Sequence, residues 1–248
     1  MMSLTDPSLA VVVRKQIQFK MKSCIGMFST LIVLQLIALV FSFGGTGMMG
    51  GTRSSLEYEM NYYSADIILV FTMLWAFINA ILIKTKDYRE DDFVFVTNRV
   101  SSNLSNIVLL LIVSIVGAIT AMLSSYLLRI GIYFFSDNKE IIYTEVEFLE
   151  LLTGIIAAGL FIFLFSGLGY IIGTLVQLNK TFAFIIPVVF LGFIFLVEMS
   201  SEVHLLLEIG KFYFNEESFW LLTSKTIMTS GLLFTAAMLV SNRLEVKQ

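Results

Sequence analysis

The sequence predicts an all-α membrane protein with six transmembrane helices, and three observations support this fold class. The chain of 248 residues is 57% hydrophobic and only 14% charged, whereas ordinary soluble domains are about 45–50% apolar. Its mean hydropathy of +0.88 is correspondingly high. Six apolar runs, separated by polar stretches, are each compatible with a membrane-spanning helix. We therefore interpret residues 1–248 as a single transmembrane domain.

Residues 5–22 are predicted to form an amphipathic helix that lies in the membrane interface. Asp6 is a candidate N-cap, and Pro7 occupies the first helical position. Apolar residues recur at helical spacing on one face, as expected for a helix that lies flat on lipid. The cations of this helix that we expect to meet lipid phosphates are Lys15, Lys20 and Lys22. An ordinary cationic flank before the first span is the alternative interpretation.

Six apolar runs follow, and each predicts one membrane helix. Their approximate bounds are 23–43, 65–83, 107–126, 151–175, 182–197 and 219–240. The third run continues past Arg129 to Phe135, so its helix must tilt or extend into water. In the fourth run, Gly169 and Gly173 have the four-residue spacing that permits close helix packing or a dimer seam.

The cations are distributed unequally between the two sides of this six-span arrangement. With the N-terminus inside, eleven of the sixteen Lys and Arg residues lie on the inner side, namely Arg14, Lys15, Lys20, Lys22, Lys84, Lys86, Arg89, Arg99, Lys180, Arg243 and Lys247. The five on the outer side are Arg53, Arg129, Lys139, Lys211 and Lys225. Because cytoplasmic loops are enriched in Lys and Arg, we expect both termini to be cytoplasmic.

Two outer segments have unusual compositions. The Gly-rich stretch 44–51 lacks the Lys-Ser/Thr pair of a phosphate-binding loop, so we expect a flexible loop there. Residues 198–218 are too polar to span a membrane and too apolar for a plain loop, which is compatible with short helices that re-enter the membrane. His204 lies in this segment near Glu198 and Glu202, but the spacing matches no zinc pattern, and we expect no metal site.

The spans lack the residues on which an intramembrane enzyme depends. Cys24 is the only cysteine and His204 the only histidine, so no disulfide within the chain and no multi-histidine metal cluster can form. The ionisable Asp66 and Lys225 lie near outer span ends, where their side chains can reach water. We therefore expect no catalytic residue, and we expect the energy for any transport to enter elsewhere than through ionisable groups in these spans.

The longest polar interval between two apolar runs is residues 84–105, which is predicted to be cytoplasmic. Its charged residues surround a short apolar stretch, Phe93 to Val96, that is too short to cross a bilayer. A solvated charged loop is one interpretation of this interval. The other is a docking segment whose apolar residues contact a partner.

The same interval carries a resemblance to a known family. Tyr88-Arg89-Glu90-Asp91-Asp92, followed by Phe93 and Phe95 and then by Thr97-Asn98-Arg99-Val100-Ser101, is similar to the first cytoplasmic loop of that family. With the N-terminal helix and the six spans, the chain resembles the permease subunit of ATP-binding-cassette exporters of the second type, which include drug, antimicrobial-peptide and polysaccharide exporters. The resemblance covers essentially the whole chain. Asn98 stands where proline is common, and the glycine-threonine-leucine that often follows the Arg-Glu pair is missing.

The resemblance implies that this loop contains a coupling helix that docks onto a separate ATPase. The residues it assigns to the contact are Tyr88, Arg89, Glu90, Asp91, Asp92, Phe93, Phe95, Val96 and Arg99. Apolar side chains in such a contact supply a buried hot spot, and charges form a rim that sets orientation. The sequence contains no P-loop, so ATP and Mg would be bound by the partner, with no cofactor in this chain.

The resemblance also implies a multi-pass protein of the bacterial plasma membrane that pairs with a second permease subunit, identical or different. The expected substrate is hydrophobic or amphipathic, such as a peptide, a drug or a lipid, and we expect no nucleic-acid partner. Three other functions are compatible with the sequence. They are a substrate-binding component of an uptake system, a membrane enzyme, and an immunity or sensor protein that binds a toxin without transporting it.

Overall fold

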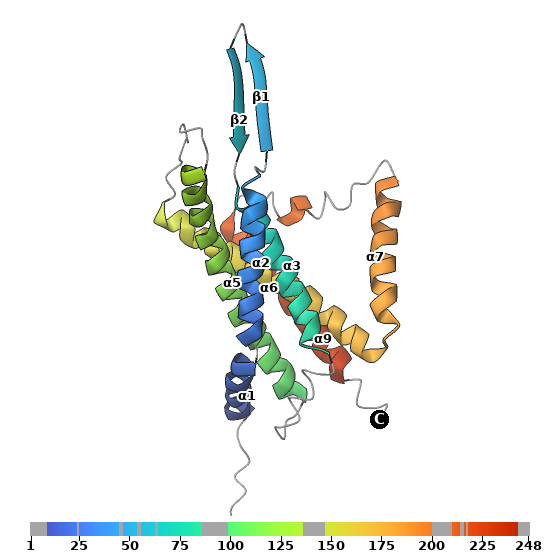
Figure 1. Ribbon diagram of the computed structural model, residues 1–248. Coiled ribbons are helices and arrows are strands. Elements are labelled where there is room, and N and C mark those ends of the chain that lie inside the picture. The colour runs from blue at the N-terminus through green and yellow to red at the C-terminus, as the bar shows by residue number, and fades with distance from the viewer. Residues whose placement is uncertain are drawn as a thin grey trace, which may run out of the picture.

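The computed structural model of the chain describes residues 9–23, 25–44, 47–53, 56–62, 64–85, 99–135, 147–199, 210–213, 216 and 218–242. The main elements of this part of the chain are helices and one two-stranded hairpin (Figure 1). In chain order they are α1 (Leu9–Ser23), α2 (Ile25–Ser42), β1 (Gly47–Arg53), β2 (Leu56–Tyr62), α3 (Asp66–Leu82), α5 (Arg99–Phe135), α6 (Phe148–Leu178), α7 (Phe182–Met199) and α9 (Phe219–Asn242).

Four of the described helices are long and apolar enough to cross a membrane. They comprise Ile25–Ser42, Val100–Phe134, Phe148–Leu178 and Phe219–Ser241. Two further stretches, Asp66–Leu82 in α3 and Phe182–Phe193 in α7, are apolar but shorter. The chain is therefore a largely helical protein with the character of a membrane protein, and a helix occupies each of the six apolar runs.

Helix α5 is longer than the apolar run that predicted it. It contains 37 residues, which at about 1.5 Å per residue corresponds to roughly 55 Å, more than the roughly 40–45 Å of a whole bilayer. It begins at Arg99 rather than near Ile107, because the polar residues of its first two turns are buried against other helices. The polar start of α5 is therefore part of the core.

Helix α6 is the centre of the bundle, since α3, α5 and α9 all pack against it. Its glycines allow this packing in three directions. A Cβ on Gly159 would lie 3.6 Å from the Ala118 side chain in α5, and a Cβ on Gly167 would lie 3.4 Å from the Phe234 ring in α9. Gly169 faces α3, where a Cβ would meet the backbone of Phe77 and the side chain of Ala80. Helix α7, in contrast, stands apart from the bundle and is largely exposed along its length (Figure 1).

The hairpin corrects the prediction of a flexible loop at residues 44–51. Strands β1 and β2 pair antiparallel, with Gly47 opposite Tyr62 and Arg53 opposite Leu56. The reason is the composition of residues 56–62, where apolar or aromatic residues alternate with polar ones in the two-residue period of a strand. The sequence of β1 is rich in glycine and does not show this alternation, so it did not indicate a strand.

The helices run back and forth, so their ends gather in two groups. Helix α1, the end of α3, the start of α5, the turn 179–181 and the end of α9 lie at one end of the molecule, and the hairpin lies at the other (Figure 1). We call the first of these ends the base. The predicted docking segment joins α3 to α5 and is therefore anchored at the base.

Candidate functional site

The predicted docking residues lie almost entirely outside the described part of the chain. This holds for Tyr88 through Val96, and Arg99 enters only as the first residue of α5. The structure does describe both flanks of the segment, which are Lys84 and Thr85 after α3 and the first turns of α5. The site is therefore built from the residues that hold these flanks.

Lys84, Asn103 and Tyr170 meet at the base, and we refer to them as the clamp. The ammonium group of Lys84 donates a hydrogen bond of 2.6 Å to the Asn103 side-chain oxygen. The Tyr170 hydroxyl donates to the same oxygen at 2.9 Å. Lys84 Nζ also lies 4.3 Å from the centre of the Tyr170 ring, which is cation–π geometry. The clamp therefore joins the end of α3, the start of α5 and the last third of α6.

Local structure places Lys84 at this position. The backbone N–H groups of Lys84 and Thr85 donate to the carbonyls of Ile81 and Leu82, which closes the last turn of α3. A cation at the C-terminal end of a helix is favourable because that end carries partial negative charge. The lysine stem then extends from α3 across the face of α6.

Gly169 and Gly173 are the reason why α3 can approach α6 closely. A Cβ on Gly169 would overlap the backbone carbonyl oxygen of Phe77, and a Cβ on Gly173 would lie 3.0 Å from the Cβ of Lys84. The four-residue glycine spacing thus contacts another helix of the same chain. It brings Lys84 directly over the ring of Tyr170, which lies one turn from Gly173.

A second polar cluster joins α1 to α5. Lys20 Nζ donates to Ser105 Oγ at 2.9 Å and to the Asn106 side-chain oxygen at 2.5 Å. Gln16, one turn earlier on the same face of α1, is fully buried, and neither polar atom of its amide has a hydrogen-bond partner in the described structure. The face of α1 that packs on α5 is therefore largely polar.

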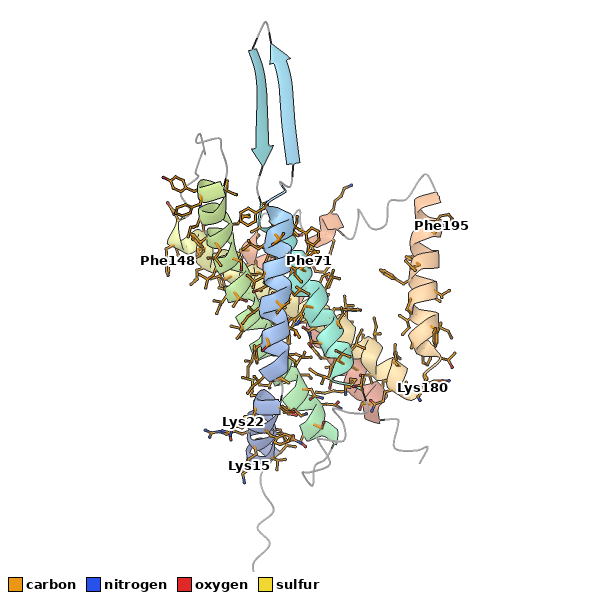
Figure 2. The ribbon with its side chains drawn as sticks, viewed as in Figure 1. Lys15, Lys22, Phe71, Phe148, Lys180 and Phe195 are labelled. Carbon is orange, nitrogen blue, oxygen red and sulfur yellow. The ribbon has the colours of Figure 1, made fainter. Side chains whose placement is uncertain are left out.

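This arrangement differs from the expectation that all three lysines of α1 meet lipid phosphates. Lys15 and Lys22 are exposed and project from α1 (Figure 2). Lys20 is only 8% exposed and is bonded to α5 instead. The physical reason is that this face of α1 packs against α5, where a buried ammonium group must find acceptors within the protein, and Ser105 and Asn106 supply them.

Cations lie at the first turns of α5. Lys20 and Lys84 both bond to the first turns of α5, and Arg99 is its first residue, whereas this first turn contains no acidic residue. The N-terminal end of a helix itself carries partial positive charge. The arrangement favours acidic groups at the base, and four acidic residues lie in the adjoining segment, at positions 87 and 90–92.

A third polar cluster lies deeper among the helices and is uncharged. The Gln35 amide nitrogen of α2 lies within hydrogen-bond distance of Thr72 Oγ1 in α3 at 3.2 Å, the Gly117 carbonyl at 3.4 Å and Thr120 Oγ1 in α5 at 3.0 Å. Gln35 interrupts an otherwise apolar run in the sequence, but the sequence does not indicate its partners. Thr72 and Thr120 also bond within their own helices, so nothing in their local sequence marked this contact.

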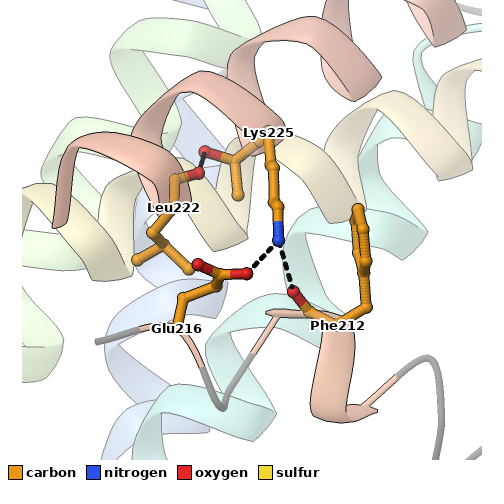
Figure 3. Close-up of polar contacts among 5 residues, drawn as sticks. Phe212, Glu216, Leu222 and Lys225 are labelled. Atoms are coloured by element: carbon orange, nitrogen blue, oxygen red, sulfur yellow. Dashed lines mark hydrogen bonds and ion pairs between the residues drawn. The ribbon is translucent and has the colours of Figure 1, made fainter. Parts of the chain in front are cut away.

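At the opposite end, Lys225 of α9 is held by the segment that precedes this helix. It forms an ion pair with Glu216, donates to the Phe212 carbonyl at 3.3 Å, and lies 4.0 Å from the centre of the Phe212 ring (Figure 3). The Lys225 side chain remains 25% exposed, so it makes this contact at a position where it can also reach water. His204 and Glu202 lie outside the described residues, and within those residues no group of three or more His, Cys, Asp or Glu side chains is placed to hold a metal.

No family model, curated protein or solved structure matches this chain.

Proposed function

We propose that the chain is the permease subunit of an ATP-driven exporter in the bacterial plasma membrane, and that it docks a separate ATPase through Tyr88 to Arg99, within the cytoplasmic segment 84–105. The observation that carries the proposal is the position of this segment. It connects two helices whose ends are held together at the base by the bond between Lys84 and Asn103. A charged segment with an apolar centre, held at both ends, is suited to transmit force from a partner.

The proposal places six helices across the membrane. α2, α5, α6 and α9 are long enough by themselves, and α3 and α7, with 17 and 18 residues, are at the short end of the range of about 17–25 residues that spans a bilayer. The excess of Lys and Arg at the base supports a cytoplasmic base and cytoplasmic termini. Lys15 and Lys22 of α1 would then contact the headgroups of the inner leaflet.

In the proposed complex, Phe93, Phe95 and Val96 enter an apolar groove on the ATPase. The neighbouring charges, from Arg89 to Asp92, form the rim of the interface, and Tyr88 and Arg99 flank it. The ATPase binds ATP and Mg, while this chain and a second permease subunit form the path for a hydrophobic or amphipathic substrate. Alternating access then arises from rigid-body motion of the helices.

Co-purification tests the docking step. The full-length chain is tagged and isolated from its native membranes in mild detergent, and the co-purified proteins are assayed for ATP hydrolysis. The double variant Phe93→Asp plus Phe95→Asp should lose the ATPase, because it places two charges in the apolar contact. Lys180→Asp plus Thr181→Asp is the matched control, since both residues are exposed in the other turn at the base. Equal ATPase recovery with both double variants would refute docking through this segment.

A further inference from the structure

The clamp contacts both ends of the proposed docking segment. Lys84 precedes residues 86–98 and Asn103 follows them. The Lys84–Asn103 bond therefore fixes the positions of the two flanks of this segment relative to each other. Asn103 is 3% exposed and Tyr170 is fully buried. Hydrogen bonds from a charged donor are stronger than neutral ones, and burial strengthens them further because water does not compete. A displacement of the segment therefore acts on these three residues before it acts on the rest of the bundle.

Tyr170 connects the clamp to the centre of the bundle. Its hydroxyl donates to the Asn103 side-chain oxygen, while its ring lies against Phe234 of α9 with 5.5 Å between ring centres. Phe234 in turn contacts Phe163, two turns before Tyr170 on the same face of α6, with 4.9 Å between ring centres. Close-packed aromatic rings of this kind cannot be compressed, so movement of Tyr170 displaces α6 and α9 together.

The hydrogen bonding of Asn103 in the clamp is incomplete. Its amide oxygen accepts two hydrogen bonds, but its amide nitrogen is buried and has no acceptor in the described structure. Buried donors are almost always paired. A small rotation of α5 against α6 could give this nitrogen an acceptor. The new bond would compensate for weaker bonds from Lys84 or Tyr170, so the two arrangements would be close in free energy.

We infer that Lys84, Asn103 and Tyr170 are positioning residues that convert displacement of the docking segment into movement of α6 and α9. This inference rests on the proposed function, and it specifies which contacts couple the ATPase to the membrane helices. The clamp is separate from the docking contact, because none of its residues lies between Tyr88 and Arg99. Loss of the clamp should therefore leave docking intact and abolish the response of α6.

Distance measurement by electron paramagnetic resonance tests this separation. Spin labels are attached at Ile25→Cys in α2 and Leu178→Cys in α6, two exposed positions at the base, in a chain that also carries Cys24→Ser. The complex co-purified from native membranes is measured without nucleotide and with a non-hydrolysable ATP analogue. We expect the distance in the otherwise unchanged chain to shift when the analogue binds.

Lys84→Met and Asn103→Ala should retain the ATPase and lose most of this shift. Tyr170→Phe removes one oxygen and keeps the ring, and it should reduce the shift. If either of the other variants fails to fold, this variant tests whether the clamp couples the segment to α6. Lys84→Arg should preserve the shift because it keeps the donor and the charge over the ring. Lys180→Met, at an exposed cation of the base, is the matched control and should behave like the unchanged chain.

The outcomes separate the two proposals. If the unchanged chain recovers no ATPase, the proposed function fails and the inference fails with it. If the ATPase is recovered but the unchanged chain shows no shift, or if the clamp variants keep the full shift, the clamp does not couple the segment to α6, and the docking proposal stands without it.

Discussion

Two helix contacts at the base, α3 against α6 and α1 against α5, are held together by different kinds of interaction. In the first, Gly169 and Gly173 let the backbones approach closely, and the contact is mainly one of shape. In the second, Lys20 bonds to Ser105 and Asn106, and the buried Gln16 contributes an amide without partners. The α3–α6 contact depends on close backbone fit and tolerates no added atoms. The α1–α5 contact depends on hydrogen bonds, and some of its buried polar atoms have no partner.

The largest expected effect is at the glycine contact. Gly169→Leu should cost about 3 kcal/mol of unfolding free energy or more, because the new side chain meets the backbone of Phe77 and not a movable side chain. Helices α3 and α6 must then separate. Unfolding of the purified chain by increasing denaturing detergent measures the change.

Gly231→Leu in α9 is the matched control, since nothing lies within 4 Å of a Cβ at that position. It should leave the unfolding free energy unchanged within about 0.5 kcal/mol. Equal losses for the two variants would mean that the α3–α6 contact is not limited by backbone fit.

The polar contact of α1 should show a smaller loss. Lys20→Met removes the donor to Asn106 and leaves a buried amide oxygen behind, which should cost about 1–2 kcal/mol. Ser105 is less affected because its hydroxyl also donates to the Ser102 carbonyl. Hydrogen exchange in residues 9–23 should rise as α1 loosens from α5.

Lys22→Met is the control for charge, because this residue is exposed on the same helix. It should leave the exchange of α1 unchanged. If it accelerates exchange as much as Lys20→Met does, attraction to lipid and not the bond to α5 holds α1 in place.

These two contacts also show what the sequence can and cannot predict. The helices could be located because apolar runs of sufficient length are a local property, and the packing role of Gly169 and Gly173 follows from their spacing. The spacing does not predict that their partner is α3, since it is equally compatible with a seam between two chains. The start of α5 at Arg99 was missed because the polar residues 101–106 are buried by other helices and not by lipid.

The clamp was hidden for a similar reason. Lys84 was counted as one of many cytoplasmic cations, and Tyr170 lies inside an apolar run. The contact with Asn103 joins positions that are 19 and 67 residues apart in the chain. No local pattern links residues at such separations, because only the packing of α3 on α6 brings them together.

The uncharged Gln35 cluster should contribute less than either of the two contacts at the base. Gln35→Leu should cost about 1 kcal/mol, since hydrogen bonds between membrane helices contribute about 0.6 kcal/mol on average and at most about 1.7. The loss stays small because Thr72 and Thr120 keep the bonds within their own helices. Thr235→Val is the control, at an exposed threonine that bonds only within α9. A loss above that of Lys20→Met would show that Gln35 is the stronger polar contact.

The smallest expected effect has the opposite sign. Gln16→Leu should raise the unfolding free energy by about 0.5–1 kcal/mol, because it replaces a buried amide that has no partner by an apolar side chain of similar size. Gln18→Leu, at an exposed position of the same helix, should have no effect on unfolding in detergent. If Gln16→Leu destabilises the chain instead, the amide is bonded in the membrane, and the polar contact between α1 and α5 is more complete than its geometry here implies. If the stability rises, the Gln16 amide does not help to attach α1 to α5. The polar part of this contact then consists of the bonds from Lys20 to Ser105 and Asn106.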